Sequence, residues 1–193
     1  MEIETFLISS TVISVVAQRL LRRICKQCSS PYTPTAKEVQ LLGLDMHAVR
    51  EYEYKKGRGC GHCSYTGYRG RIAVYELLVL NEMVKEAILQ KKTAHEIREI
   101  SMETTGLVSM REDGVAKVVK GVTTFEEILE HTPRTFNMRP LRQVLHRLGD
   151  LDEPRHARRV VVGPVVDEAE RAVAVAGISV AHVVVMGSDD DQF

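Results

Sequence analysis

The chain has 193 residues, enough for one domain or for one domain with an appendage. Its 44% apolar content can form a buried core and excludes wholesale disorder. Its 26 basic and 26 acidic side chains cancel, so a global basic field for nucleic acid is absent. No apolar run is long enough to cross a bilayer, and the acidic first residues do not resemble a secretion signal.

The first predicted element is an amphipathic helix over residues 11–24. Val12, Val16 and Leu20 repeat there at helical spacing. Arginines near its end suit the negative end of a helix dipole. We therefore expect a helix that leads directly into the first pair of cysteines.

The next part of the chain is predicted to be a short helix followed by extended structure. Thr35 and Glu38 have the spacing of a capping box, and Gly43 is a natural stop for this helix. Five glycines within fourteen residues disfavour a helix over residues 51–70. Residues 71–80 then read as a strand.

Three or four short helices are predicted after residue 80, because helix-capping signals recur there. Gly106 and Gly121 are natural helix ends. The caps are Asn81, Thr93 with Glu96, Ser109 with Glu112, and Thr124 with Glu127. This part is predicted to be a compact, mostly helical unit.

The composition of the chain changes near Pro133. All nine lysines precede it, and the eight basic residues after it are all arginines. We expect a boundary at about 133–139 and leave residues 133–193 without a functional assignment. Pro140 is predicted to open a helix, and a strand–helix–strand unit is expected further on. The helix has the apolar face Leu141, Val144, Leu145 and Leu148, and the unit spans residues 160–162, 166–176 and 183–185.

The strongest chemical signal is a pair of C-x2-C motifs separated by 31 residues, formed by Cys25, Cys28, Cys60 and Cys63. A C-x2-C turn directs both sulfurs at one centre, and two turns complete the tetrahedron that zinc prefers. A shell of four thiolates leaves no open position on the metal. The pattern therefore indicates a structural zinc ion, with Gly59 and Gly61 relieving the steric demand of the second turn.

Other interpretations of the cysteines stay open. They are two disulfides, a thioredoxin-like redox pair and an iron–sulfur cluster. His62 has the position to replace a thiolate, although an exposed turn residue is the simpler interpretation. A zinc ribbon for nucleic acid is a further alternative, because basic residues, Tyr65 and Tyr68 flank the motifs. The spacing exceeds the usual ribbon spacing of about 15–20 residues.

Several motifs occur in one order across residues 1–132, and they resemble a known family. The resemblance is to the C-terminal part of the type II secretion and type IV pilus assembly ATPases, the general secretory pathway E family. Its motifs are Gln18-Arg19-Leu20, Arg23-Ile24-Cys25, Gly59-Cys60, Thr66-Gly67-Tyr68-Arg69-Gly70-Arg71 and Met110-Arg111-Glu112-Asp113-Gly114.

The resemblance implies an α/β, mostly α fold and a piece of a hexameric cytoplasmic motor peripheral to the inner membrane. Residues 1–24 would end a RecA-like nucleotide domain, closed by the predicted helix. Residues 25–80 would form a zinc-clip subdomain holding structural Zn²⁺, and residues 81–132 a C-terminal helical domain. The implied partners are other ATPase subunits and inner-membrane assembly platform proteins. Neither nucleic acid nor a transmembrane segment is expected.

The chain departs from a complete ATPase in one respect. It contains no Gly-Lys dipeptide and therefore no Walker A phosphate loop. In the family this loop and the Walker B acidic motif lie upstream of the matched region. ATP and Mg²⁺ are accordingly expected only with the complete family protein. We expect a truncated or internal piece that does not hydrolyse ATP alone, and a non-functional remnant is an alternative.

Individual charged residues have weaker interpretations. Arg69 and Arg71 follow the second cysteine pair, where they could contact a nucleotide or a neighbouring subunit, or be plain surface arginines. The run at residues 111–113 is expected to begin a helix and to pack, not to catalyse. Glu76 has no partner that the sequence identifies.

Overall fold

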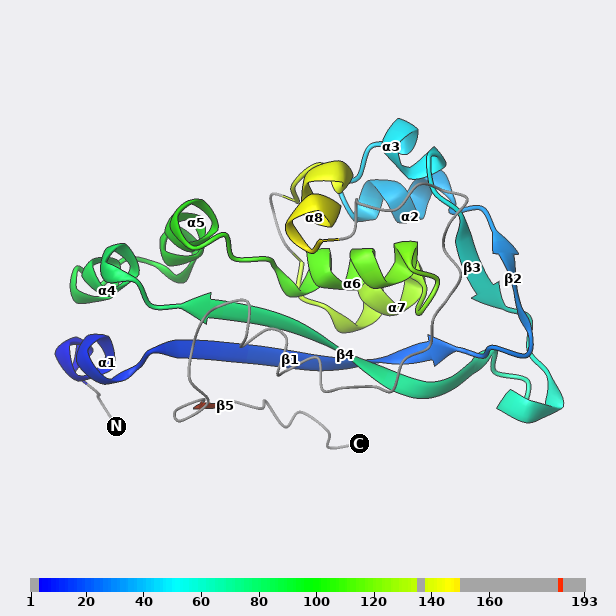
Figure 1. The fold of residues 1–193 in the computed structure, drawn as a ribbon, viewed down its shortest axis with the longest axis horizontal. Coiled ribbons are helices and arrows are strands. Elements are labelled where there is room, and N and C mark those ends of the chain that lie inside the picture. The colour runs from blue at the N-terminus through cyan, green and yellow to red at the C-terminus, as the bar shows by residue number, and fades with distance from the viewer. Residues whose placement is uncertain (1–3, 135–137, 150–183, 186–193) are drawn as a thin grey trace.

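A computed structural model describes residues 4–134, 138–149 and 184–185 of the chain. Its centre is a long two-stranded antiparallel ribbon formed by β1 (Ser14–Ile24) and β4 (Tyr68–Val79). The ribbon runs along the longest axis of the molecule (Figure 1). The fold is a mixed α/β arrangement, as expected.

Helices and a second sheet are distributed along this ribbon (Figure 1). One end carries α1 (Thr5–Thr11), α4 (Glu82–Leu89) and α5 (Ala94–Thr104). The layer over the middle consists of α6 (Met110–Val119) and α7 (Phe125–His131). Packed on that layer are α2 (Ala36–Leu41) and α8 (Leu141–Arg147), followed by α3 (Met46–Arg50). The other end carries the antiparallel pair β2 (Ser29–Tyr32) and β3 (Tyr54–Gly57).

The register of the ribbon brings distant parts of the chain together. Ser14 lies opposite Val79, and Arg22 lies opposite Arg71. A register shift follows Arg22. A short parallel strand, β5 (Val184–Val185), pairs with the other edge of β1.

The predicted helix over residues 11–24 is wrong. The helix is α1, which ends at Thr11, and most of the predicted segment is strand β1. A short apolar run such as residues 12–17 does not by itself distinguish a helix from a strand. This run is rich in β-branched residues, which favour strands, and β4 supplies the backbone hydrogen bonds. Tertiary pairing therefore determines its conformation. The strand predicted over residues 71–80 is confirmed as β4.

The predicted capping signals correctly locate α2 and the helices from α4 to α7. Complete capping boxes are formed by Thr35 with Glu38, Thr93 with Glu96 and Ser109 with Glu112. The side chain of Asn81 accepts a hydrogen bond from the N–H of Val84 at the start of α4. Gly43, Gly106 and Gly121 follow helix ends with φ of +68°, +73° and +69°. Thr124 caps α7, but the Glu127 carboxylate is used elsewhere.

The main core lies between the ribbon and the helices above it. The rings of Tyr54 and Phe125 are 5.1 Å apart between centroids and join β3 to α7. The core side chains come from both strands of the ribbon and from α2, α3, β3, α6, α7 and α8. They include Leu21, Val39, Val49, Tyr54, Val74, Val115, Phe125, Ile128, Leu141 and Leu145.

The described part of residues 133–193 includes the helix predicted after Pro140. It is α8, whose Leu141, Val144 and Leu145 are buried. Val184 and Val185 form β5, whereas the strand expected over residues 160–162 and the helix expected over 166–176 lie outside the described residues. Within the described residues, no helix combines the length and the apolar character that crossing a membrane requires.

One ion pair, between a buried carboxylate and a half-exposed arginine, fastens α7 to the ribbon. The side chain of Glu127 is fully buried and accepts hydrogen bonds from the backbone N–H of Arg22 and from its Nε, each at 2.8 Å. Burial by itself raises the pKa of Glu127, but the hydrogen bonds and charge of Arg22 have the larger combined effect. The pKa of Glu127 therefore lies below its ordinary value of 4.5.

We expect Glu127→Gln to lower the free energy of unfolding by about 1–3 kcal/mol, because it weakens charge-assisted bonds at a buried site. Urea denaturation measures this loss. The control is Glu126→Gln on the same helix. Glu126 is half-exposed and pairs with Lys56 at 2.9 Å, so its loss is expected to stay within about 0.5 kcal/mol. Equal effects of the two variants would contradict this role for Glu127.

The difference in stability between the unmodified chain and Glu127→Gln is also expected to depend on pH. A carboxyl group whose pKa is lowered by folding stabilises the folded state above its unfolded pKa, and this contribution is lost as pH falls through the folded pKa. The stability gap between the unmodified chain and Glu127→Gln should narrow as the pH falls below about pH 4.5. Urea midpoints of both proteins, matched for metal content, test this. A gap that widens in acid would contradict the assignment.

Candidate metal centre

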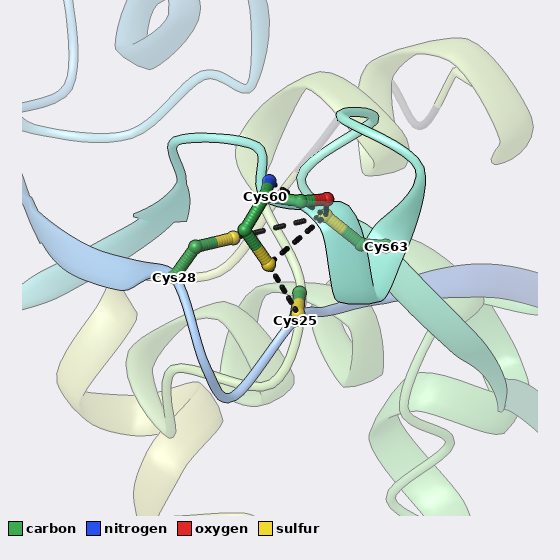
Figure 2. Close-up of side chains that lie close together, drawn as sticks. All are labelled: Cys25, Cys28, Cys60 and Cys63. Atoms are coloured by element: carbon green, nitrogen blue, oxygen red, sulfur yellow. Dashed lines mark hydrogen bonds between the residues drawn. The ribbon is translucent and has the colours of Figure 1, made fainter.

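The four cysteines meet at one end of the ribbon, where they come from two separate segments (Figure 2). Cys25 directly follows β1, and Cys28 directly precedes β2. Cys60 precedes the short 3-10 helix η1 (Gly61–Cys63), and Cys63 ends it. The ligand set predicted from the sequence is therefore brought together by the fold.

The sulfur positions fit a tetrahedral metal site. The Sγ atoms of Cys25 and Cys60 are 4.0 Å apart, those of Cys28 and Cys63 are 3.9 Å apart, and those of Cys60 and Cys63 are 3.8 Å apart. All four lie within 4.8 Å of one another. Metal–sulfur bonds of about 2.3 Å in a tetrahedron place the sulfurs about 3.8 Å apart. The four thiols are free, so they remain available as ligands.

The backbone around the cysteines favours a thiolate at Cys63. Its Sγ accepts hydrogen bonds from the N–H groups of Cys60, at 3.2 Å, and Gly67, at 3.3 Å. Burial raises the pKa of the Cys63 thiol, but these bonds lower it by more, and the net shift is downward. Burial raises the pKa of Cys28, and a hydrogen bond from Gly59 only partly offsets this. Cys63 is therefore the more readily deprotonated of the two.

The two cysteine segments are held together by backbone contacts. The N–H of Cys25 donates to the carbonyl of Gly67 at 2.9 Å, and the N–H of Arg58 donates to the carbonyl of Cys28 at 3.0 Å. Gly57 and Gly67 pack backbone against backbone, so that a Cβ on Gly57 would lie 2.0 Å from the Gly67 oxygen. Close approach of the loops therefore requires glycine at position 57.

The glycines that flank Cys60 differ in their importance. Gly59 has φ of +91°, and a Cβ there would lie 2.6 Å from the Tyr65 oxygen. Gly61 has no atom within 4 Å of such a Cβ. The steric role predicted for Gly59 is confirmed, whereas that predicted for Gly61 is wrong because the space beside it is open.

The charged residues singled out from the sequence lie on the surface beside the centre. His62 is exposed, as expected, and its carbonyl accepts a hydrogen bond from Nη1 of Arg69 at 2.5 Å. Arg71 is exposed in β4, opposite Arg22 of β1. Arg69 is thus fastened to the cysteine loop, whereas Arg71 lies in the paired part of the ribbon.

The two segments that carry the cysteines are basic, although the chain as a whole has no net charge. Residues 5–37 and 54–75 contain no acidic side chain. Helix α7 supplies carboxylates to this stretch, with Glu126 bound to Lys56 and Glu127 bound to Arg22. These ion pairs place a carboxylate beside Lys56 and another beside Arg22, two of the basic residues of this stretch.

Other charged residues have structural partners that sequence reasoning missed. Glu76 accepts hydrogen bonds from Arg98 at 3.0 Å and from the N–H of Met110 at 3.1 Å. Glu112 is fully buried and binds Nη2 of Arg139 at 2.6 Å. The packing role expected for residues 111–113 is confirmed, because Arg111 and Glu112 are buried. No sequence signal identifies these partners, because they lie 22 to 34 residues apart.

Comparison with known proteins identifies the family of the chain. The sequence profile described as "Type II/IV secretion system protein" matches residues 1–130. The chain belongs to this family. The resemblance inferred from the cysteine, arginine and glycine motifs is thereby confirmed.

Characterised relatives support the same assignment. The chain is 41% identical over 132 residues to the type IV pilus assembly ATPase PilB of Thermus thermophilus. It is 42% identical to type II secretion system protein E of Pseudomonas aeruginosa and 35% identical to type II secretion system ATPase E of Vibrio cholerae. Each match covers 68% of this chain, but only 15%, 26% and 25% of these relatives. The chain thus corresponds to a minor part of each relative.

We expect Gly57→Ala to disrupt the centre, because its new methyl group would overlap the Gly67 carbonyl. Overpacking of this kind costs about 1–3 kcal/mol of unfolding free energy, and bound metal per chain should fall. The control is Gly61→Ala, where the space is open and the change should stay within about 0.5 kcal/mol. Chemical denaturation and elemental analysis measure both effects. Normal metal content in Gly57→Ala would contradict the importance of this contact.

Proposed function

We propose that the chain is the C-terminal module of an ATPase that powers assembly of a type II secretion pseudopilus or a type IV pilus. The observation that carries the proposal is the match of residues 1–130 to the family, with relatives named as such ATPases. The chain has no Walker A pattern. We therefore propose that it contributes structure to the motor and does not hydrolyse ATP by itself.

In this proposal residues 1–24 belong to the end of a RecA-like nucleotide domain. Residues 25–80 form the zinc-clip subdomain, and residues 81–132 form the C-terminal helical domain. The motor is a cytoplasmic hexamer peripheral to the inner membrane, and its partners are other ATPase subunits and inner-membrane platform proteins. The family assignment supports these points.

The proposed metal is a structural Zn²⁺ ion. Four thiolates are a characteristic zinc ligand set. The sulfur separations of 3.8 to 4.0 Å fit a tetrahedron with zinc–sulfur bonds of about 2.3 Å. Such an ion would join the end of β1 to the loop before β4. Cys25, Cys28, Cys60 and Cys63 would hold it, and its closed shell would give it no part in ATP chemistry.

Purified protein should contain about one zinc ion per chain. A chelator should lower the melting temperature markedly, because the free energy of binding a structural ion contributes to the stability of the folded state. Elemental analysis and thermal melting before and after chelation measure this. Cys28→Ser, which removes one ligand at a half-buried position, should lose most of the metal. Four titratable thiols without metal in the untreated protein would contradict the zinc site.

We also propose that Arg69 and Arg71 act at a nucleotide or subunit contact in the assembled motor. Both are exposed, and Arg69 binds the His62 carbonyl of the cysteine loop. An arginine that binds phosphate or a carboxylate contributes charge-assisted hydrogen bonds. Plain surface arginines are the alternative, so the proposal is tested in an assembled hexamer.

The decisive experiment is a chimera. Residues 1–132 replace the matched segment of Pseudomonas aeruginosa type II secretion system protein E, and ATP hydrolysis and secretion are measured. We expect both to be retained, and we expect the isolated chain to be inactive. Arg71→Ala in the chimera should lower turnover about tenfold or more, since a charge-assisted bond is lost. Arg58→Ala, an exposed arginine of the same region, serves as control.

Two results would contradict the proposals. A chimera that folds, binds zinc and assembles but neither hydrolyses ATP nor supports secretion would overturn the module assignment. An active chimera in which Arg71→Ala and Arg58→Ala behave alike would leave the module assignment intact and remove the special role of Arg71.

A further inference from the structure

The four cysteines differ in their access to solvent. Cys25 is 1% exposed and Cys63 is 6% exposed, whereas Cys28 and Cys60 are only partly buried. One accessible cysteine and one buried cysteine therefore come from each C-x2-C motif. An oxidant from solvent would reach Cys28 and Cys60 first.

Each accessible sulfur has a buried neighbour on the other segment. Cys28 Sγ lies 3.9 Å from Cys63 Sγ, and Cys60 Sγ lies 4.0 Å from Cys25 Sγ. Figure 2 shows the four side chains converging from the two loops. A cysteine oxidised to a sulfenic acid condenses with a neighbouring thiol to give a disulfide. The geometry thus supplies a resolving cysteine for each accessible one.

We propose that this centre is an oxidation site at which hydrogen peroxide forms two disulfides between the segments, Cys25–Cys60 and Cys28–Cys63. For each disulfide, the peroxide oxygen bond breaks as one sulfur is oxidised to a sulfenic acid, with release of one water. The second sulfur attacks it, the S–S bond forms, and the sulfenic oxygen leaves as a second water. Two hydrogen peroxide molecules accept the four electrons from four sulfurs, and any bound metal ion is released.

Pairing within each motif is the competing arrangement. Cys60 and Cys63 are 3.8 Å apart, and a disulfide between them would leave Cys25 to pair with Cys28, whose sulfur lies within 4.8 Å. Cross-pairing uses two existing contacts of similar length. It consumes all four thiols and joins the two segments.

The pairing has a structural consequence. The disulfides would connect the same two segments that a bound metal ion connects, so the loops would stay joined after the metal is lost. Pairing within each motif would leave the segments unconnected. The inference rests on the positions of the cysteines and not on the proposed ATPase function.

The test uses the full chain, loaded with zinc and treated with hydrogen peroxide. Zinc release is followed with a chromogenic chelator, and trypsin peptides are then mapped without reduction. Trypsin separates Cys25, in residues 24–26, from Cys28, in residues 27–37, and leaves Cys60 and Cys63 together in residues 59–69. We expect one species that contains all three peptides, formed as zinc is lost. A peptide 59–69 with an internal disulfide, or sulfinic acids instead of disulfides, would overturn the proposal.

Two double variants identify the partners. Cys28→Ser with Cys63→Ser retains the Cys25 and Cys60 contact, whereas Cys28→Ser with Cys60→Ser retains Cys25 and Cys63. Each removes two ligands, so any loss of folding affects both. We expect the first to cross-link faster, because its reacting sulfurs are already in contact at 4.0 Å. Equal rates would overturn the assigned pairing, and the mapping of the unmodified chain tests the oxidation site independently.

Discussion

The antiparallel pairing of β1 with β4 is the constraint on which the other parts of the structure depend. It joins residues 14–24 to residues 68–79 over almost the whole length of both strands. At one end it places Cys25 beside Gly67, whose carbonyl accepts the Cys25 N–H. The loop that carries Cys63 is thereby held over the end of β1. The metal centre is thus a continuation of the ribbon.

Carboxylates connect this ribbon to the helices above it. Each joins the backbone of one element to the side chain of another, and such charge-assisted bonds are stronger and more directional than apolar contacts. Glu127 of α7 accepts from a β1 N–H, Asp113 of α6 accepts from the Tyr75 N–H of β4, and Glu76 of β4 accepts from the first N–H of α6. These bonds set where α6 and α7 lie along the ribbon, while the apolar core sets how far the two helices lie from it.

Local signals in the sequence were sufficient for the helices that begin with a capping residue named above and for the ligand set. A capping box such as Ser109 with Glu112 is complete within four residues, and the two C-x2-C motifs restrict their sulfurs to one centre. The long strand could not be predicted in this way. Its apolar run fits helix and strand alike until β4, more than forty residues later, pairs with it. The partners of Glu76 and Glu127 could not be predicted either, because they too lie far away in the sequence.

The position of the cysteines at the closed end of the ribbon has a consequence for the order in which the chain folds. Pairing β1 with β4 requires closure of a long loop. The chain entropy lost in this closure is offset only after many of the strand pairs have formed. An ion bound by both C-x2-C turns would close that loop first. Ile24 and Tyr68 would then be adjacent, and the strands could pair one residue after another towards Ser14 and Val79. Metal supply would in this way govern the rate at which the domain forms, as well as its stability.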